Sequence, residues 1–190
     1  MGGQSIINKL TKLRQMGFAI PWKLISMGRC TPEIALEQVS RAEIVAYLMT
    51  LLEGSADPVT EAQTVSLICA AEDDEAFDRK LQRLAQDDPS DTALQWRKWC
   101  AYSLAQILEA DFQDPVQGLT ELLFFWCNIG DSARCPHDLM EKISPEAFFT
   151  DSNYQQVLAQ NRAWLQGERK EIIMQEGQCR NAAVAQQRET

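Results

Sequence analysis

The sequence has a single histidine, no Cys-x-x-Cys pair and no glycine-rich loop of the kinds that bind nucleotides. It lacks G-x-x-x-x-G-K-[ST] and G-x-G-x-x-G, and it also lacks the H-E-x-x-H and G-x-S-x-G motifs of zinc proteases and serine hydrolases. The longest fully apolar run, 122–127, is far shorter than the ~20 residues that span a membrane. No stretch alternates with period two between turn signals, which argues against a sheet.

Acidic residues are absent from the first 32 positions, which carry Lys9, Lys12, Arg14, Lys23 and Arg29. All 27 acids therefore lie in residues 33–190 against 13 bases, and this part has a net charge of −14. The density peaks within residues 53–91, where eleven acids face three bases. Such a field repels nucleic acid and anionic membranes and speeds the encounter with a basic partner. We therefore expect no nucleic-acid partner and no membrane partner.

Capping residues placed directly before prolines divide the chain into helices, as at Asp57-Pro58, Asp114-Pro115 and Ser144-Pro145. The apolar spacing between these marks is helical. The predicted helices are 5–16, 21–29, 32–53 with a break near Ser40, 58–71, 75–86, 91–110, 115–129 and 152–175, with a short helical turn near 136–149. Because the connections are short, we expect antiparallel neighbours. The prediction is an all-α fold of about eight helices, with antiparallel hairpins packed as a bundle or short stack.

We predict one helical domain over residues 1–175, followed by 176–190 as an extension of the last helix or a flexible tail. The six cysteines are widely and irregularly spaced, so we expect reduced thiols in a cytoplasmic protein. Residues 1–7 lack the apolar core of a signal peptide. The oligomeric state is left open.

The carboxylates of residues 72–75, followed by Asp78, allow more than one interpretation. Several oxygens together suit a hard divalent cation, but the run lacks the central glycine of an EF-hand loop. Acids at the start of a helix also complement the positive end of its dipole, and a dense acidic run suits a basic partner. We expect no metal and no cofactor.

His137 follows Cys135 closely, and Cys127 lies ten positions before it. This spacing matches no common zinc site. A nucleophilic pair of His137 with either cysteine is open in principle, but the sequence identifies no third residue to orient the imidazole. We therefore predict that the protein is not an enzyme.

Pro21-Trp22-Lys23-Leu24-Ile25-Ser26-Met27-Gly28 resembles the W-x-x-I-x-x-G opening helix of a small helical family. Arg97-Lys98-Trp99-Cys100-Ala101-Tyr102, followed by Asp114-Pro115, is similar to that family's Lys-Trp helix and Asp-Pro turn. The family contains immunity proteins of bacterial polymorphic toxins, including contact-dependent growth inhibition systems. Its acidic, aromatic segment beyond the Asp-Pro turn is replaced here by the apolar stretch 124–129.

The resemblance implies a cytoplasmic immunity protein that binds and neutralises a cognate toxin without catalysis. Many such toxins are nucleases with basic surfaces, because they must grip phosphate. We expect an acidic contact surface made of Asp73, Asp74, Glu75, Asp78, Asp87, Asp88 and Asp91. Two alternatives are a helical-hairpin scaffold that binds a protein through an apolar groove, and a metal-dependent enzyme that uses the carboxylates.

Reversing two charges in the acidic run tests this surface. We expect Asp74→Lys combined with Asp78→Lys to weaken toxin binding and to lessen its salt dependence, because complementary charges steer association. The measurement is the dissociation constant over a range of ionic strength. Unchanged affinity with unchanged salt dependence would move the contact to another surface.

Overall fold

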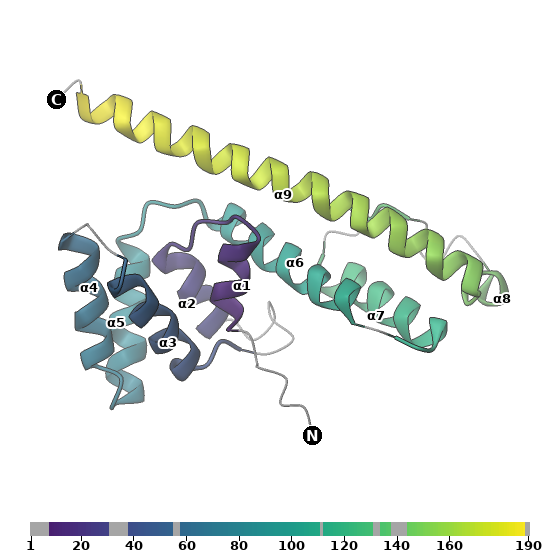
Figure 1. The fold of residues 1–190 in the computed structure, drawn as a ribbon, viewed down its shortest axis with the longest axis horizontal. Coiled ribbons are helices and arrows are strands. Elements are labelled where there is room, and N and C mark those ends of the chain that lie inside the picture. Colours follow the sequence, from purple (N-terminus) through teal and green to yellow (C-terminus); the bar gives the residue numbers. More distant parts are fainter. Residues whose placement is uncertain are drawn as a thin grey trace. The chain divides into compact units, whose positions relative to one another are not determined.

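The computed structural model describes residues 8–30, 38–54, 58–110, 112–130, 134–137 and 144–188. These ranges contain helices and connections but no strand, so the predicted all-α fold is confirmed (Figure 1). The helices are α1 (Lys9–Gln15), α2 (Trp22–Cys30), α3 (Arg41–Leu52), α4 (Pro58–Cys69), α5 (Asp74–Gln86), α6 (Thr92–Glu109), α7 (Pro115–Asn128), α8 (Pro145–Phe148) and α9 (Asp151–Arg188). Across the same ranges, no helix combines the length and the apolar character needed to cross a membrane.

The start of α3 lies at the break predicted within the helix 32–53. The Ser40 side chain accepts a hydrogen bond from the Glu43 N–H (3.2 Å), and Glu43 Oε2 accepts one from the Ser40 N–H (2.9 Å). This reciprocal capping box satisfies two N–H groups and begins the helix at Arg41. Residues 38–40 are not helical, and 31–37 lie outside the described residues. The break predicted near Ser40 is thus the beginning of the helix.

Side-chain caps also set the other boundaries. Asn8 Oδ1 accepts from the Leu10 N–H (2.9 Å) and begins α1, later than the predicted 5–16, of which 5–7 are not described. The Asp-Pro and Ser-Pro pairs before α7 and α8 cap those helices as predicted. α4 begins at Pro58, although Asp57 before it is outside the described residues. α9 continues to Arg188, well past the predicted end at 175.

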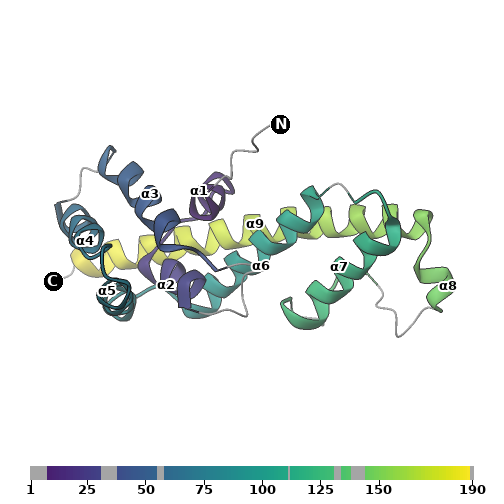
Figure 2. The same cartoon turned by 90° about the horizontal axis from the view of Figure 1, so that it is seen from below.

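The contacts divide the chain into two compact units, Met1–Trp99 and Cys100–Thr190, with the division inside α6. In the first unit α2 packs on α5, beside which it lies in Figure 2, and α3 packs on α1 and α4. In the second unit α7 packs on α9. One helix thus contributes to both units, and the single domain over residues 1–175 stays a prediction.

The core of the first unit depends on a close approach of α2 to Trp99. Trp99 is fully buried, and its Nε1–H donates to the Leu24 carbonyl (3.0 Å). A Cβ added at Gly28 would lie 2.2 Å from Trp99 Cζ2, closer than any real contact. The neighbouring Lys98 is buried too, and its Nζ donates to the Ala19 carbonyl (2.9 Å). The tryptophan therefore requires a glycine at position 28.

The second unit has an aromatic core in which the rings meet edge to face. Trp126 is almost fully buried, and its ring centroid lies 5.0 Å from that of Phe125 and 4.9 Å from that of Trp164. Gly118 allows α7 to approach α9, because a Cβ there would lie 2.5 Å from the Tyr154 ring. Edge-to-face pairs of this kind add to the burial of apolar area.

Gly28→Ala tests the packing of α2 on Trp99. We expect it to lower the free energy of unfolding by about 1–3 kcal/mol, the usual cost of overpacking a core. The measurement is urea-induced unfolding followed by circular dichroism. Gly167→Ala is the matched control, because it lies in α9 with open space around it. It should leave stability unchanged or raise it slightly. Equal stability of Gly28→Ala and the unaltered protein would contradict the close approach.

Candidate partner-binding site

The predicted carboxylates at the start of α5 have local structural partners. Asp73 caps the helix, because its Oδ1 accepts from the Glu75 N–H (2.9 Å) and the Ala76 N–H (3.1 Å). Glu75 pairs with Arg79 one turn later (3.2 Å). Both carboxylates remain exposed to solvent. Locally, these acids therefore cap the start of α5 and complement the positive end of its dipole.

Asp74 and Asp78 are paired with arginines from elsewhere in the first unit. Arg29 Nε lies 3.0 Å from Asp78 Oδ1, and Arg41 Nη1 lies 2.9 Å from Asp74 Oδ1. Arg29 Nη2 also lies 3.6 Å from Asp74. Reversing the charge at positions 74 and 78 would thus break contacts of the fold as well as any contact with a partner.

These pairs reduce the charge contrast that the sequence displays. Lys9 likewise pairs with Glu43 (3.3 Å), so the basic N-terminal segment is folded among acids. By sequence, unit 1 holds 14 acids and 11 bases, a net charge of −3, and unit 2 holds 13 acids and 7 bases, a net charge of −6. The acidic run therefore produces a weaker field than its residue count indicates.

Asp87, Asp88 and Asp91 lie past the other end of α5, about 20 Å from its start for a helix of 13 residues. The Asp91 side chain accepts from the Ala93 N–H (3.1 Å) at the start of α6. The structure therefore divides the seven predicted residues into two groups, one at each end of α5.

Asp88 has a structural function in the second group. Its Oδ2 accepts from the Lys23 N–H (2.9 Å) and its Oδ1 from the Ser90 N–H (2.8 Å). The first turn of α2 contains no acid of its own, so Asp88 provides the negative group that this helix end favours. The side chain of Asp87, in contrast, is exposed and makes no hydrogen bond or ion pair with any described residue.

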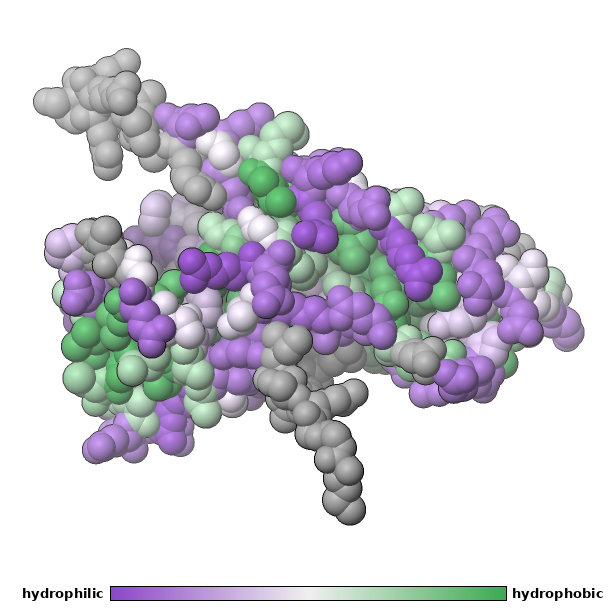
Figure 3. All heavy atoms as spheres, in the orientation of Figure 1, coloured by the Kyte–Doolittle hydropathy of each residue, from purple (hydrophilic) through white to green (hydrophobic). Residues whose placement is uncertain are grey.

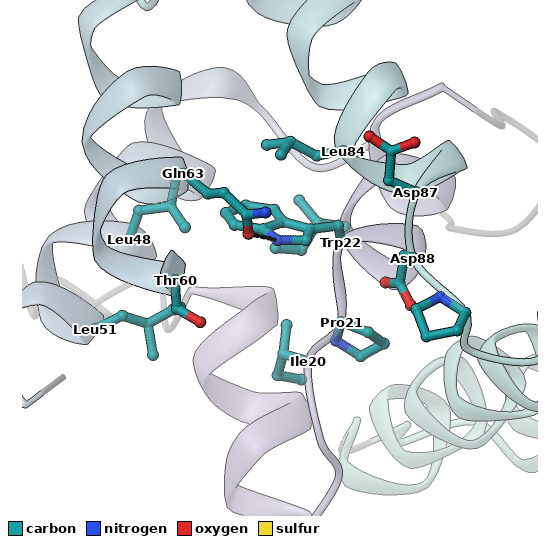
Figure 4. Close-up of a pocket in the computed structure, with 12 residues that line it drawn as sticks. Ile20, Pro21, Trp22, Leu48, Leu51, Thr60, Gln63, Leu84, Asp87 and Asp88 are labelled. Carbon is teal, nitrogen blue, oxygen red and sulfur yellow. Dashed lines mark hydrogen bonds between the residues drawn. The ribbon is translucent and has the colours of Figure 1, made fainter. Parts of the chain in front are cut away.

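A hollow of about 370 Å³ lies beside this second group, within the first unit. Figure 4 shows Asp87 and Asp88 on one side of it and Leu48 and Leu51 on the other, with the Trp22 indole between them. The Trp22 Nε1–H donates to Gln63 Oε1 (3.0 Å), which fixes the ring orientation. The remaining lining is mainly apolar and comes from Ile20, Pro21, Ile25, Leu84 and Pro89.

A second hollow of about 320 Å³ lies between α4 and α5 and shares Gln63, Leu84 and Asp87 with the first. Lys80 and Arg83 line it, and Lys80 Nζ donates to the Ser66 carbonyl (2.8 Å). The two hollows therefore adjoin, and we call them together the groove: Asp87 and Asp88 line the first hollow, and Lys80 and Arg83 line the second.

Hydrophobic side chains are also exposed on α3 and α4, two of the helices that line the groove. Met49 on α3 is 50% exposed, and Val59 on α4 is 64% exposed. Figure 3 shows a group of hydrophobic side chains on the face where α3 and α4 lie in Figure 1. No local pattern of the sequence predicts the groove, because its lining comes from four helices and two connections.

The histidine of the second unit lies in a polar cluster. Asn161 is fully buried, its Oδ1 accepts from the Trp126 Nε1–H (2.8 Å), and its Nδ2 donates to the Val157 carbonyl (2.8 Å). Nδ2 also lies 3.1 Å from His137 Nδ1. With the amide orientation fixed by these bonds, this ring nitrogen acts as the acceptor of the Asn161 Nδ2–H.

Cys135 Sγ lies 3.4 Å from the same nitrogen and donates to the His137 carbonyl (3.3 Å). The sequence identified no third residue that would orient the imidazole of a Cys–His pair. In the structure, Asn161 is the residue in this position. A nucleophilic pair requires the thiol proton to move to an imidazole lone pair. Here that lone pair already accepts from Asn161, so the arrangement does not prepare the thiol for attack.

No three His, Cys, Asp or Glu side chains within the described ranges are placed to hold a metal ion. The buried Glu168 pairs instead with Arg134, whose guanidinium lies 5.4 Å from the Trp164 ring. Burial and, secondarily, the Glu168 charge raise the pKa of the Cys100 thiol to about 12. Glu168 and Cys100 thus form part of the packed interior of the second unit.

No protein family model, curated protein or solved structure matches this chain. The resemblance to immunity proteins therefore stays a prediction. The residues that carry it meet in the core, where Gly28 and Leu24 contact Trp99. These residues therefore account for the packing of α2 on α6. The candidate binding site is the groove around Trp22.

Alkylation of the cysteines tests the assignment of Cys135 and Cys100. With iodoacetamide at neutral pH, the exposed thiols should react first: Cys30, Cys69, Cys127 and Cys179. We expect Cys135 to react no faster than these, and Cys100 to react only on unfolding, because the thiolate is the reactive form. Peptide mass spectrometry over time gives the rates. Labelling of Cys135 well ahead of the exposed group would favour the nucleophilic pair.

Proposed function

We propose that the chain is a cytoplasmic immunity protein that binds and neutralises a cognate toxin with a basic surface and performs no catalysis of its own. The observation that supports this function best is the groove of the first unit, where the exposed carboxylate of Asp87 lies beside an apolar hollow. Protein-binding sites commonly combine an apolar centre with charged groups at the rim.

Charge contributes to this function in two ways. The net charge of −9 attracts a basic protein at long range and speeds its encounter. At short range, the Asp87 carboxylate is available to a cation of the toxin, whereas Asp74 and Asp78 are already paired with arginines. We therefore place the contact nearer the α5–α6 connection than the start of α5. A toxin whose basic active-site surface is covered in this way cannot bind phosphate.

A scaffold that binds a protein through an apolar groove is the second candidate. The continuation of the groove between α4 and α5 favours it, as do the exposed side chains of Met49 and Val59. Its binding would depend on apolar area and vary little with salt. Salt dependence therefore distinguishes the two functions.

Capture of the partner and one charge-neutral substitution test the proposal. The purified protein should retain a single basic protein from cells that express its neighbouring genes, and high salt should weaken that complex. Asp87→Asn should weaken the affinity about twofold to fivefold, the usual range for an exposed charge pair.

Glu121→Gln is the matched control, because it removes the same charge from α7 in the other unit. It should leave the affinity unchanged. Retention of neutral partners at high salt, or equal effects of the two substitutions, would contradict the acidic contact and favour the scaffold.

A further inference from the structure

The lining of the hollow beside α2 combines three features: aliphatic walls, an indole ring and two carboxylates. Its walls are aliphatic, with Leu48 and Leu51 on one side. The Trp22 indole lies within it and is held by Gln63. Two neighbouring carboxylates, Asp87 and Asp88, line the side opposite the leucines, as Figure 4 shows. An occupant that suits all three has an apolar stem and a flat cationic end.

We propose that this hollow binds an arginine side chain of the partner, with its methylene stem along the leucines and its guanidinium at Trp22 and the two carboxylates. The inference rests on the proposed function, since it assumes a basic protein partner. It names the side chain that the site accepts and the residues that would contact it.

Charge complementarity supports a cationic occupant. The Asp87 side chain makes no hydrogen bond or ion pair with the described residues, and the Asp88 carboxylate accepts from two backbone N–H groups but from no cationic side chain. Two basic residues lie near these carboxylates. Lys23 Nζ donates to the Ser90 carbonyl, and Arg83 shares the hollow between α4 and α5 with Asp87 but forms no ion pair with it. A cationic side chain that enters the hollow would therefore contact two carboxylates that have no cationic partner.

The aromatic ring supports arginine over lysine. A guanidinium is planar, stacks on indole faces and presents several N–H donors to neighbouring carboxylates. An ammonium is compact and strongly hydrated, and it loses more on leaving water. The volume of about 370 Å³ is near the lower end of ligand pockets, which suits one inserted side chain.

A blocked tripeptide with arginine between two alanines is the probe. Two matched peptides replace the arginine by citrulline, which has the same shape without charge, or by norleucine, which has only the stem. Binding is followed by the indole N–H resonances in two-dimensional NMR spectra of the full chain, with the Trp22 signal assigned through Trp22→Phe. We expect the arginine peptide to shift the Trp22 signal saturably and to bind at least about fivefold more tightly than the citrulline peptide.

Asp87→Asn is the decisive variant, because the exposed Asp87 side chain has no hydrogen bond or ion pair with the described residues to lose. It should weaken the arginine peptide about twofold to fivefold and leave the norleucine peptide unaffected. Glu121→Gln should change neither. Equal binding of arginine and citrulline, tighter binding of norleucine, or no saturable shift of Trp22 would overturn the inference.

The two proposals fail in different ways. If the tripeptide does not bind while a basic partner is still captured in an Asp87-dependent manner, the arginine inference is wrong and the proposed function stands. If the arginine tripeptide binds and the captured partner is neutral and salt-resistant, the site is supported as an arginine pocket and the immunity function is contradicted.

Discussion

Trp99 can lie against α2 only because residue 28 has no Cβ, and the rest of the first unit is arranged around that contact. The indole fills the core and is tied to the Leu24 carbonyl, so the position of α2 is fixed near its middle. Asp88 caps the beginning of the helix, and Arg29 near its end pairs with Asp78 on α5. Trp22, at the first position of α2, is thereby held in the groove. A larger residue at 28 would displace both the core and the candidate site.

Electrostatics in this protein depends more on the fold than on the order of residues. The basic N-terminal segment and the acidic run are far apart in sequence, but Arg29 and Arg41 bring positive charge to the start of α5. Pairs at the surface contribute little stability, typically below about 1 kcal/mol each. Among the seven carboxylates of the predicted contact surface, Asp87, at the far end of the helix, is the one whose side chain makes no hydrogen bond or ion pair with a described residue.

Local signals predicted most of the helices well. Caps and prolines act over a few residues, so Asp114-Pro115 and Ser144-Pro145 mark the starts of α7 and α8 correctly. Within the helix predicted over 32–53, the break near Ser40 is confirmed, because residues 38–40 are not helical and the capping box of Ser40 and Glu43 begins α3 at Arg41. The helix predicted over 152–175 continues to Arg188, because a single glycine such as Gly177 is tolerated within a helix.

The candidate site could be predicted only in part. Asp87 and Asp88 were identified from charge density, but the contacts that distinguish them from Asp74 and Asp78 join residues far apart in the chain. The groove around Trp22 depends on α2, α3, α4 and α5 together, and no local pattern predicts it. No local pattern predicts the contact between Asn161 and His137 either. Asn161 lies on α9, and His137 lies in the connection before α8.

Hydrogen–deuterium exchange of the full chain, alone and with its captured partner, tests the central claim most directly. The account predicts slowed exchange on binding at the beginning of α2, along the facing sides of α4 and α5, and at the α5–α6 connection. Protection confined to α7 and α9, with the first unit unchanged, would contradict it.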